Sequence, residues 1–162
     1  MNPSRKLLLL GGLALASFGM LYGVHYALFV EHQTLDRMGD SLASAFVNAA
    51  ERQMPEAGSS IASFADTKYD YVRQVDVHSH WIGLAMLMIV LGVVFDRVGF
   101  PERVRCVIAA ALLMGAIVFP LGVILQTAHH GSALASELAI AGSGIVIASL
   151  AAVAVGFSRA ES

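Results

Sequence analysis

The chain has 162 residues, of which 57% are hydrophobic and only 14% carry a charge. About a quarter of an ordinary soluble domain is charged, so this composition indicates a protein whose solvent is lipid. The net charge of −2 and the absence of a basic cluster in the sequence exclude nucleic acid as a partner. The single cysteine, Cys106, cannot form an internal disulfide, and without a Cys-x-x-Cys-His motif the chain cannot attach a c-type haem covalently.

Four apolar segments are long enough to cross a bilayer, which takes about 20 residues. They are predicted at about residues 7–30, 76–96, 104–128 and 136–157. The second span is long enough only if its helix begins near Val75, which places His78 and His80 on the helix and not in a loop. We therefore predict a single membrane domain over residues 1–162: an all-α, four-transmembrane-helix bundle with an outer helical insert over residues 33–74.

Basic residues near the ends of spans mark the cytoplasmic side of a membrane protein. One side of the predicted bundle carries six basic residues against three acids, and the other carries four against nine. The first side, which holds both the N- and the C-terminus, is therefore predicted to be cytoplasmic in a bacterial-type inner membrane. The first span also has the Arg-Lys start and the Ala-Leu-Ala sequence of a secretory signal, but its apolar run continues to Val30, which favours a retained anchor.

Small residues at helical spacing predict where spans approach one another closely. The first span carries such a stripe at Gly12, Ala16, Gly19 and Gly23. The last span carries another at Gly144, Ala148, Ala152 and Gly156. We interpret both stripes as ordinary packing faces of the bundle rather than as a dedicated dimer surface.

The outer insert is predicted to form two amphipathic helices separated by a break at Pro55 and Gly58. Apolar residues recur at intervals of three and four on both sides of this break. They are Leu35, Met38, Leu42, Ala45, Phe46 and Ala49 before it, and Ile61, Phe64, the aliphatic stem of Lys68, Val72 and Val75 after it. The two helices could cap the bundle, lie in the membrane interface, or dock on a partner subunit. The sequence does not choose among these three arrangements.

All six histidines fall near the predicted outer ends of spans: His25 at the outer end of the first and His32 just past it, His78 and His80 at the start of the second, and His129 and His130 at the end of the third. Imidazole is the commonest metal ligand, and an ionisable residue in a span is a functional candidate by default. His78 and His80 are about 200° apart around a helix, and His129 and His130 about 100° apart. At most one member of each pair can therefore aim squarely at a common centre.

A b-type haem is the first cofactor that these histidines predict. It needs two imidazoles facing each other across the bundle between apolar walls. The second and third spans offer such pairs, and the candidate haem-binding residues are His78, His80, His129, His130 and, deepest in the membrane, His25.

A copper or zinc ion is the alternative cofactor. Such an ion needs three or four imidazoles from different helices. The candidate metal ligands are His32, His78, His80 and His130. Taken alone, each histidine is better interpreted as an amphipathic residue lying where the membrane meets water, whereas the cluster of six favours a functional site.

The segment from His78 to Met86 (HSHWIGLAM) resembles the His-x-His opening of an outer-facing helix in certain small four-span membrane proteins. Those proteins are distantly similar to the catalytic subunit of haem-copper oxidases and to NnrS-type haem-copper proteins. The glycine-containing segments 120–122 (PLG) and 141–144 (AGSG) fit the same outline. The resemblance implies histidine-ligated haem or copper near the outer face, carried by His78, His80 and His129, and it implies nothing about a substrate.

Two functions from different classes remain open. The first is a membrane protein that binds haem b or a transition metal at the periplasmic face and transfers electrons, with a quinone, a periplasmic electron carrier or a respiratory complex as partner. The second is a cofactor-free accessory subunit that packs against other membrane subunits. The chain has no Gly-x-Ser-x-Gly or His-Glu-x-x-His motif, so an electron-transfer or accessory role is favoured over a stand-alone enzyme.

Overall fold

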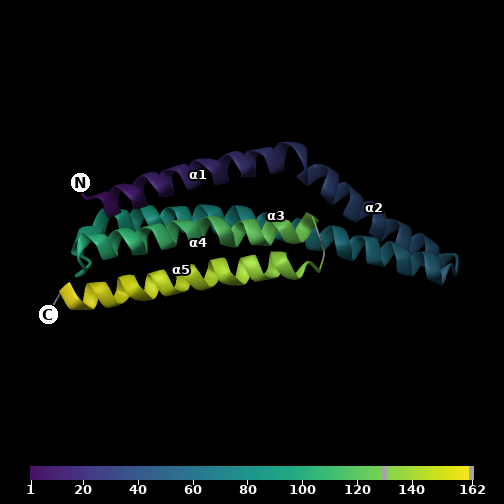
Figure 1. The fold of residues 1–162 in the computed structure, drawn as a ribbon. Helices are drawn as coiled ribbons and strands as arrows, with labels where there is room; N and C mark the ends of the chain where they lie inside the picture. The colour runs from purple at the N-terminus through teal and green to yellow at the C-terminus, as the bar shows by residue number, and fades with distance from the viewer. Residues whose placement is uncertain (129–130, 161–162) are drawn as a thin grey trace.

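The computed structural model describes residues 1–128 and 131–160, which form long helices joined by short connections (Figure 1). The helices are α1 (Pro3–Phe29), α2 (Glu31–Ala50), α3 (Met54–Val94), α4 (Glu102–Ala128) and α5 (Ala133–Ala160), and a short 3-10 helix, η1 (Phe95–Arg97), follows α3. Four of them, α1, α3, α4 and α5, are long and apolar enough to cross a membrane. The predicted all-α, four-span architecture is therefore confirmed.

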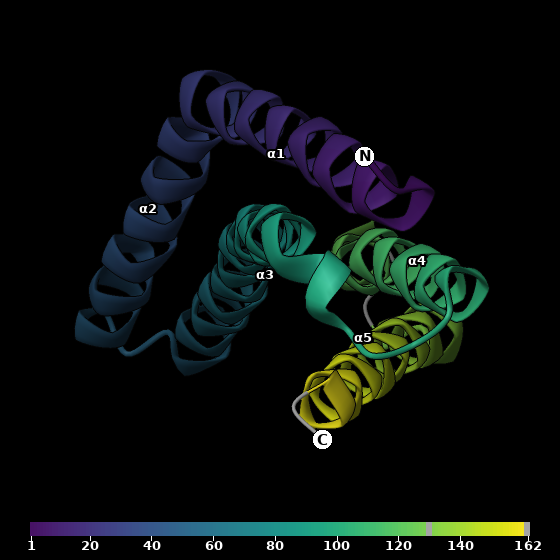
Figure 2. The ribbon, with the colours of Figure 1, turned by 90° about the vertical axis from the view of Figure 1, so that its left-hand side faces the viewer.

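The four spanning helices alternate in direction, so both chain ends lie at one end of the bundle (Figure 1). We call this the termini end and the opposite end, where α1 passes into α2, the hairpin end. Helices α1, α3 and α4 pack on one another, and α5 packs on α4 and η1. In the described parts of the chain the backbone of α5 does not come close to that of α1 or α3, so α5 forms an edge of the bundle (Figure 2).

Helix α3 is much longer than a membrane span. Its 41 residues extend about 60 Å at 1.5 Å per residue, whereas the hydrocarbon core of a bilayer is about 30 Å thick. The second half of α3 is the second span, and the first half pairs with α2 in an antiparallel hairpin that extends beyond the bundle (Figure 1).

No helix boundary separates the insert from the second span: the helix that was predicted to begin near Val75 begins at Met54. Helix α3 is continuous because no glycine or proline interrupts the sequence between Gly58 and Gly83. The predicted break at Pro55 and Gly58 is also displaced, to residues 51–53, because Pro55 lies in the first helical turn, where its missing N–H is not needed. His78 and His80 are helical, as predicted.

The chain bends at Val30, where α1 passes into α2. The backbone of Val30 has φ −122° and ψ −42°, yet its N–H still donates to the Tyr26 carbonyl at 2.9 Å, and its carbonyl accepts from the Thr34 N–H at 3.0 Å. The hydrogen-bond ladder therefore continues through the bend. As a result α2 leaves the axis of α1 and crosses onto α3 (Figure 1).

Glycines set the closest helix contacts in the bundle. On α1, a Cβ atom added at Gly12 would lie 2.8 Å from Ile89 Cγ1, and one added at Gly19 would lie 3.0 Å from Ile82 Cδ1. A Cβ added at Gly142 of α5 would clash with the backbone of Phe119 in α4. The small-residue stripe predicted on the first span is therefore a packing face against α3.

The stripe predicted on the last span is only partly a packing face. Gly156 is buried against Val98, but Ala148 and Gly144 are exposed, and a Cβ at Gly144 would meet nothing within 4 Å. A strict four-residue spacing turns about 40° per step around an α-helix, so Gly144 and Gly156 differ by about 120° and cannot both face one neighbour. The α1 stripe mixes intervals of three and four residues, so its first and last members, Gly12 and Gly23, differ by only about 20° around the helix axis.

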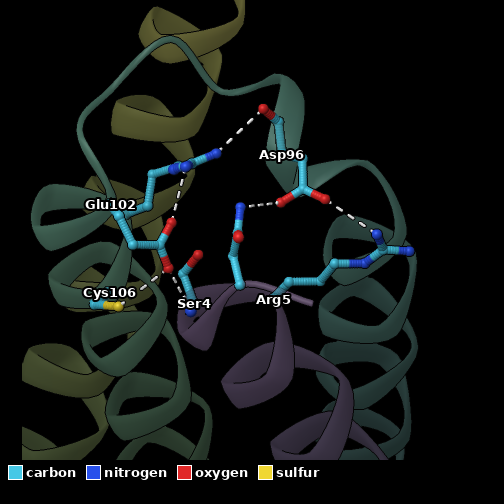
Figure 3. A network of polar contacts seen from close by, with 7 residues as sticks. Ser4, Arg5, Asp96, Glu102 and Cys106 are labelled. Carbon is cyan, nitrogen blue, oxygen red and sulfur yellow. Dashed lines mark hydrogen bonds and ion pairs between the residues drawn. The ribbon is translucent and has the colours of Figure 1, made fainter.

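Polar contacts join three segments at the termini end (Figure 3). The backbone N–H of Ser4, in the first turn of α1, donates to Glu102 Oε1 at 2.8 Å, and Arg105 pairs with the same carboxylate at 2.8 Å. Arg5 Nη1 lies 3.0 Å from Asp96 Oδ2, and Arg105 also donates to the Asp96 carbonyl. Two cations and two carboxylates thus fix the start of α1 to η1 and to the start of α4.

Candidate functional site

The hairpin of α2 and α3 packs through a seam of mostly small and polar residues. The less exposed positions repeat at alternating intervals of three and four: Thr34, Met38, Ser41, Ala45 and Asn48 on α2, and Ala57, Ser60, Phe64, Thr67 and Tyr71 on α3. Ser41 and Ser63 hydroxyls lie 3.3 Å apart, and Asn48 donates to Ser60 Oγ at 3.5 Å. The spacing is that of a heptad coiled coil, although most of the side chains at the seam are not typical coiled-coil residues.

Large apolar residues lie beside this seam, exposed. Leu35 and Leu42 each directly follow a seam residue of α2, and Ile61 directly follows Ser60 of α3. Val75 lies two heptads after Ile61 and so occupies the same position, with Lys68 between them. Two antiparallel helices are related by a twofold axis perpendicular to the plane of the two helix axes. Residues at the same heptad position of the two helices therefore lie on the same side of that plane. We call this surface the apolar flank; it consists of Leu35, Leu42, Phe46, Ile61, Val72 and Val75, which are 40% to 69% exposed.

The opposite side of the hairpin is polar except for Val47, which precedes Asn48 and is 55% exposed. Arg37 and Ser44 of α2, and Ser63 and Asp70 of α3, precede seam residues and so lie on this second side. Arg37 and Asp70 both line a polar cavity of about 220 Å³ that reaches Thr127 of α4. The hairpin is therefore amphipathic as a pair of helices, with one apolar and one polar side.

A second cavity, of about 350 Å³, lies where α1 bends away from α3, and we call it the elbow cavity. Apolar side chains of Met20, Val24, Ala27 and Val75 form part of its wall. Its polar lining comes from Tyr26, Glu31, Gln74 and His78. The cavity thus combines an apolar wall with polar groups at the hairpin end of the bundle.

His78 is fixed between α1 and α3. Its Nδ1 lies 3.0 Å from the carbonyl oxygen of Gly19, and a Cβ atom at Gly23 would lie 2.5 Å from its Cε1. A carbonyl oxygen can only accept, so Nδ1 carries the proton and Nε2 is left with a free lone pair. Nε2 makes no hydrogen bond to any described residue, and the side chain lines the elbow cavity.

His80 points to a different neighbour. Its ring packs on Phe119 of α4 with 4.6 Å between the ring centroids. His78 and His80 therefore diverge toward α1 and α4, as the predicted separation of about 200° requires.

The other histidines do not join them in the described parts of the chain. His25 is exposed and packs on Phe29 at 5.4 Å, and His32 is exposed on α2. His129 and His130 lie outside the described residues. No three His, Cys, Asp or Glu side chains among residues 1–128 and 131–160 come together as a metal-binding group.

Comparison with protein-family models, with curated proteins and with solved structures finds no match to this chain. The resemblance to small haem-copper-like membrane proteins therefore stays a prediction that rests on residues 78–86, 120–122 and 141–144.

The sequence did not predict one feature of the hairpin end and predicted another only in part. The elbow cavity depends on the bend at Val30, which carries no proline or glycine signal. The seam was only partly predicted: the periodic set contained its members Met38, Ala45 and Phe64 together with the exposed residues beside them, and it left out the Ser, Thr and Asn residues because these are not apolar. Small or polar residues that recur at alternating intervals of three and four on both helices are the sequence signal that could have found it.

Proposed function

We propose that this protein is an accessory subunit, which anchors a helical hairpin in the membrane and uses it to dock on a larger partner. The observation that carries the proposal is the apolar flank, where Leu42, Phe46 and Ile61 are 40%, 69% and 56% exposed on a part of the chain that extends past the bundle. Apolar patches left exposed on a protein surface mark interaction sites. Helix α3 holds the hairpin along the direction of a span, which argues against an arrangement lying flat in the membrane interface.

The partner that fits this surface is a protein with an apolar strip bordered by Lys and Arg. Residues 31–76 contain eight acidic and four basic residues, a net charge of −4. That charge disfavours a second copy of the same hairpin and an anionic lipid surface, because like charges repel. A basic border on the partner would complement it and direct association.

Blue native electrophoresis of mildly solubilised membranes from the native host tests this proposal. Wild-type protein is expected in an assembly larger than one chain, and Phe46→Glu or Leu42→Glu is expected to release it, because an unpaired carboxylate is costly in an apolar contact. Ser44→Glu, which places the same charge on the polar side, is the matched control and should leave the assembly intact.

Three results would contradict the docking proposal. They are wild-type protein migrating as one chain, equal release by Ser44→Glu, and co-purification of two differently tagged copies as the sole components. The last result would show that a second copy covers the apolar flank.

A redox protein is the second candidate function: it would bind haem b, or alternatively copper or zinc, through histidines near the periplasmic face and serve electron transfer. One observation favours it. The Nδ1 of His78 donates to a backbone carbonyl, as the non-ligating nitrogen of metal-bound histidines usually does. The described residues supply no opposing imidazole, and the predicted axial partners His129 and His130 lie outside them.

Visible absorption spectra of the purified protein, oxidised and dithionite-reduced, test the redox candidate together with elemental analysis. Sharp reduced bands of a bis-imidazole haem that disappear in His80→Ala or His129→Ala would support it. A colourless and metal-free protein purified from the native host would reject it and leave the accessory role.

A further inference from the structure

We propose that the elbow cavity binds the head of a lipid-soluble hydroquinone, which enters from the bilayer between α1 and α3. The cavity lies where the spans meet the hairpin, and it shares Val75 with the apolar flank. The proposal does not require that the hairpin docks on a partner. It rests on the shape of the cavity, on the hydrogen-bonding groups that line it, and on its charge.

The cavity is shaped for an amphipathic molecule. Its volume of about 350 Å³ lies within the usual range for small-molecule sites, about 300–1,000 Å³. Met20, Val24 and Val75, which line it, are 57%, 53% and 40% exposed. Met20 and Val24 belong to the exposed surface of a spanning helix, where lipid is the solvent, so a lipophilic molecule can reach the cavity by lateral diffusion.

Four polar side chains line the cavity, and acceptors dominate among them. The Tyr26 hydroxyl is itself buried, and Gln74 Nε2 already donates to Thr127 at 3.4 Å. This leaves His78 and Glu31 to face a ligand.

His78 is held with Nδ1 protonated by its bond to the Gly19 carbonyl, so its Nε2 can only accept while the ring is neutral. Glu31, when ionised, has two acceptor oxygens, one of which receives the Tyr71 hydroxyl at a long 3.5 Å. A ligand that satisfies both groups must therefore donate hydrogen bonds.

The charge of the lining narrows the ligand class further. No Lys or Arg side chain lines the elbow cavity in the described parts of the chain. A phospholipid headgroup would bring its phosphate beside Glu31 without a compensating cation. The oxidised quinone has only acceptor oxygens, whereas a hydroquinone has two O–H donors on an uncharged ring.

Equilibrium titration of the whole protein in phosphatidylcholine nanodiscs tests this site, with decylubiquinol under anaerobic conditions as the probe and decylubiquinone as its oxidised counterpart. The hydroquinone is expected to bind about tenfold more tightly than the quinone, because each unmatched acceptor is costly. Glu31→Gln is expected to weaken hydroquinone binding about tenfold, since it replaces a charged acceptor by a neutral amide.

A matched pair of tryptophan variants tests the location. Val24→Trp should fill the cavity from its lipid-exposed side and abolish binding, whereas Val90→Trp, at a residue 59% exposed on α3 and outside the cavity lining, should not. Neither change alters a buried contact, so both variants are expected to fold. Equal affinity for quinone and hydroquinone, unchanged binding by Val24→Trp, equal loss by Val90→Trp, or displacement of the probe by phosphatidylethanolamine would each overturn the proposal.

Discussion

At the hairpin end, the position of the His78 side chain depends on glycines in the facing helix, which have no side chain of their own. The imidazole of His78 fits beside α1 only because position 23 is a glycine, and the same ring then reaches the Gly19 carbonyl. Gly19 in turn lets the α3 backbone approach beside Trp81, which is 2% exposed and packs edge-on with Phe18 and with the Tyr22 ring. Two glycines one turn apart thus set both the helix contact and the orientation of the histidine.

Gly23→Ala is expected to displace the His78 ring. The new methyl group would lie 2.5 Å from Cε1 and 2.7 Å from Nδ1, so the ring must rotate away and lose its bond to Gly19. In ¹⁵N-histidine-labelled protein, NMR should show Nδ1 protonated in the wild type and a loss of this tautomer in the variant. Gly83→Ala, where an added Cβ meets nothing within 4 Å, is the control. A wild-type spectrum with the proton on Nε2 would contradict the assignment.

At the termini end, Glu102→Ala is expected to lower the Tm of the protein in detergent. Ser4 is fully buried, and its N–H lies in the first turn of α1, where no helical acceptor exists. The change removes the acceptor of that N–H and the ion-pair partner of Arg105. Arg103→Ala, at an exposed position of the same helical turn, should leave the Tm unchanged. Equal melting curves for both variants would show that the network does not stabilise the fold.

At the scale of whole elements, α4 and α5 form the closest helix pair of the bundle. Glycines of both helices permit this approach, since a Cβ at Gly142 would clash with the Phe119 backbone, and one at Gly122 would clash with the backbone of Ala139. Because lipid gives helices little hydrophobic reason to associate, such backbone proximity is the main source of their packing energy.

Gly142→Val and Gly144→Val differ in position by only two residues and are expected to differ sharply in effect. Valine at 142 must push α5 off α4, with an expected loss of about 1–3 kcal/mol, as is usual for overpacked contacts. Valine at 144 points to open space and should be tolerated. Reversible unfolding in mixed micelles measures both, and equal destabilisation would show that the two glycines share one environment.

The sequence pattern predicted the membrane spans well, because their outward faces all meet the same solvent, lipid. The four spans and the helical placement of His78 and His80 followed from apolar length alone, and the α1 stripe followed from small residues whose spacing stays on one face. The hairpin was less predictable, because exposed Leu42 and Phe46 resemble core residues, whereas the real seam contains Ser41 and Asn48. Hydrophobic periodicity identifies an apolar face without saying whether the same chain or a partner covers it.

The candidate site was less predictable still. That His78 and His80 diverge followed from helical geometry, but the neighbour that each contacts depends on how the helices are arranged, which no local pattern specifies. The elbow cavity requires Val30 to bend the chain over Gln74, which is a tertiary effect. The predicted pairing of these histidines with His129 or His130 stays a prediction, because those two lie outside the described residues.

At the scale of the whole molecule, the fold separates two chemically different ends. The termini end is closed by ion pairs close to the bundle, whereas the hairpin end continues from the bundle as a net acidic pair of helices (Figure 1). Because α2 and the first half of α3 are one structural unit with the spans, motion of a docked partner would act directly on α3, and through it on His78 and the elbow cavity. The proposed docking surface and the proposed ligand site are therefore mechanically connected by a single helix.

This arrangement predicts which parts of the chain are accessible from each side of the membrane. The excess of basic residues at the termini end predicts that it is cytoplasmic and that the hairpin is outside. In a Cys106→Ser background, Ser59→Cys in the hairpin should react with a membrane-impermeant maleimide in spheroplasts, whereas Ser158→Cys near the end of α5 should react only after permeabilisation. Both positions are exposed, so accessibility and not burial decides the labelling. The reverse pattern would place the apolar flank and the elbow cavity at the cytoplasmic face, and the docking partner would then have to be sought there.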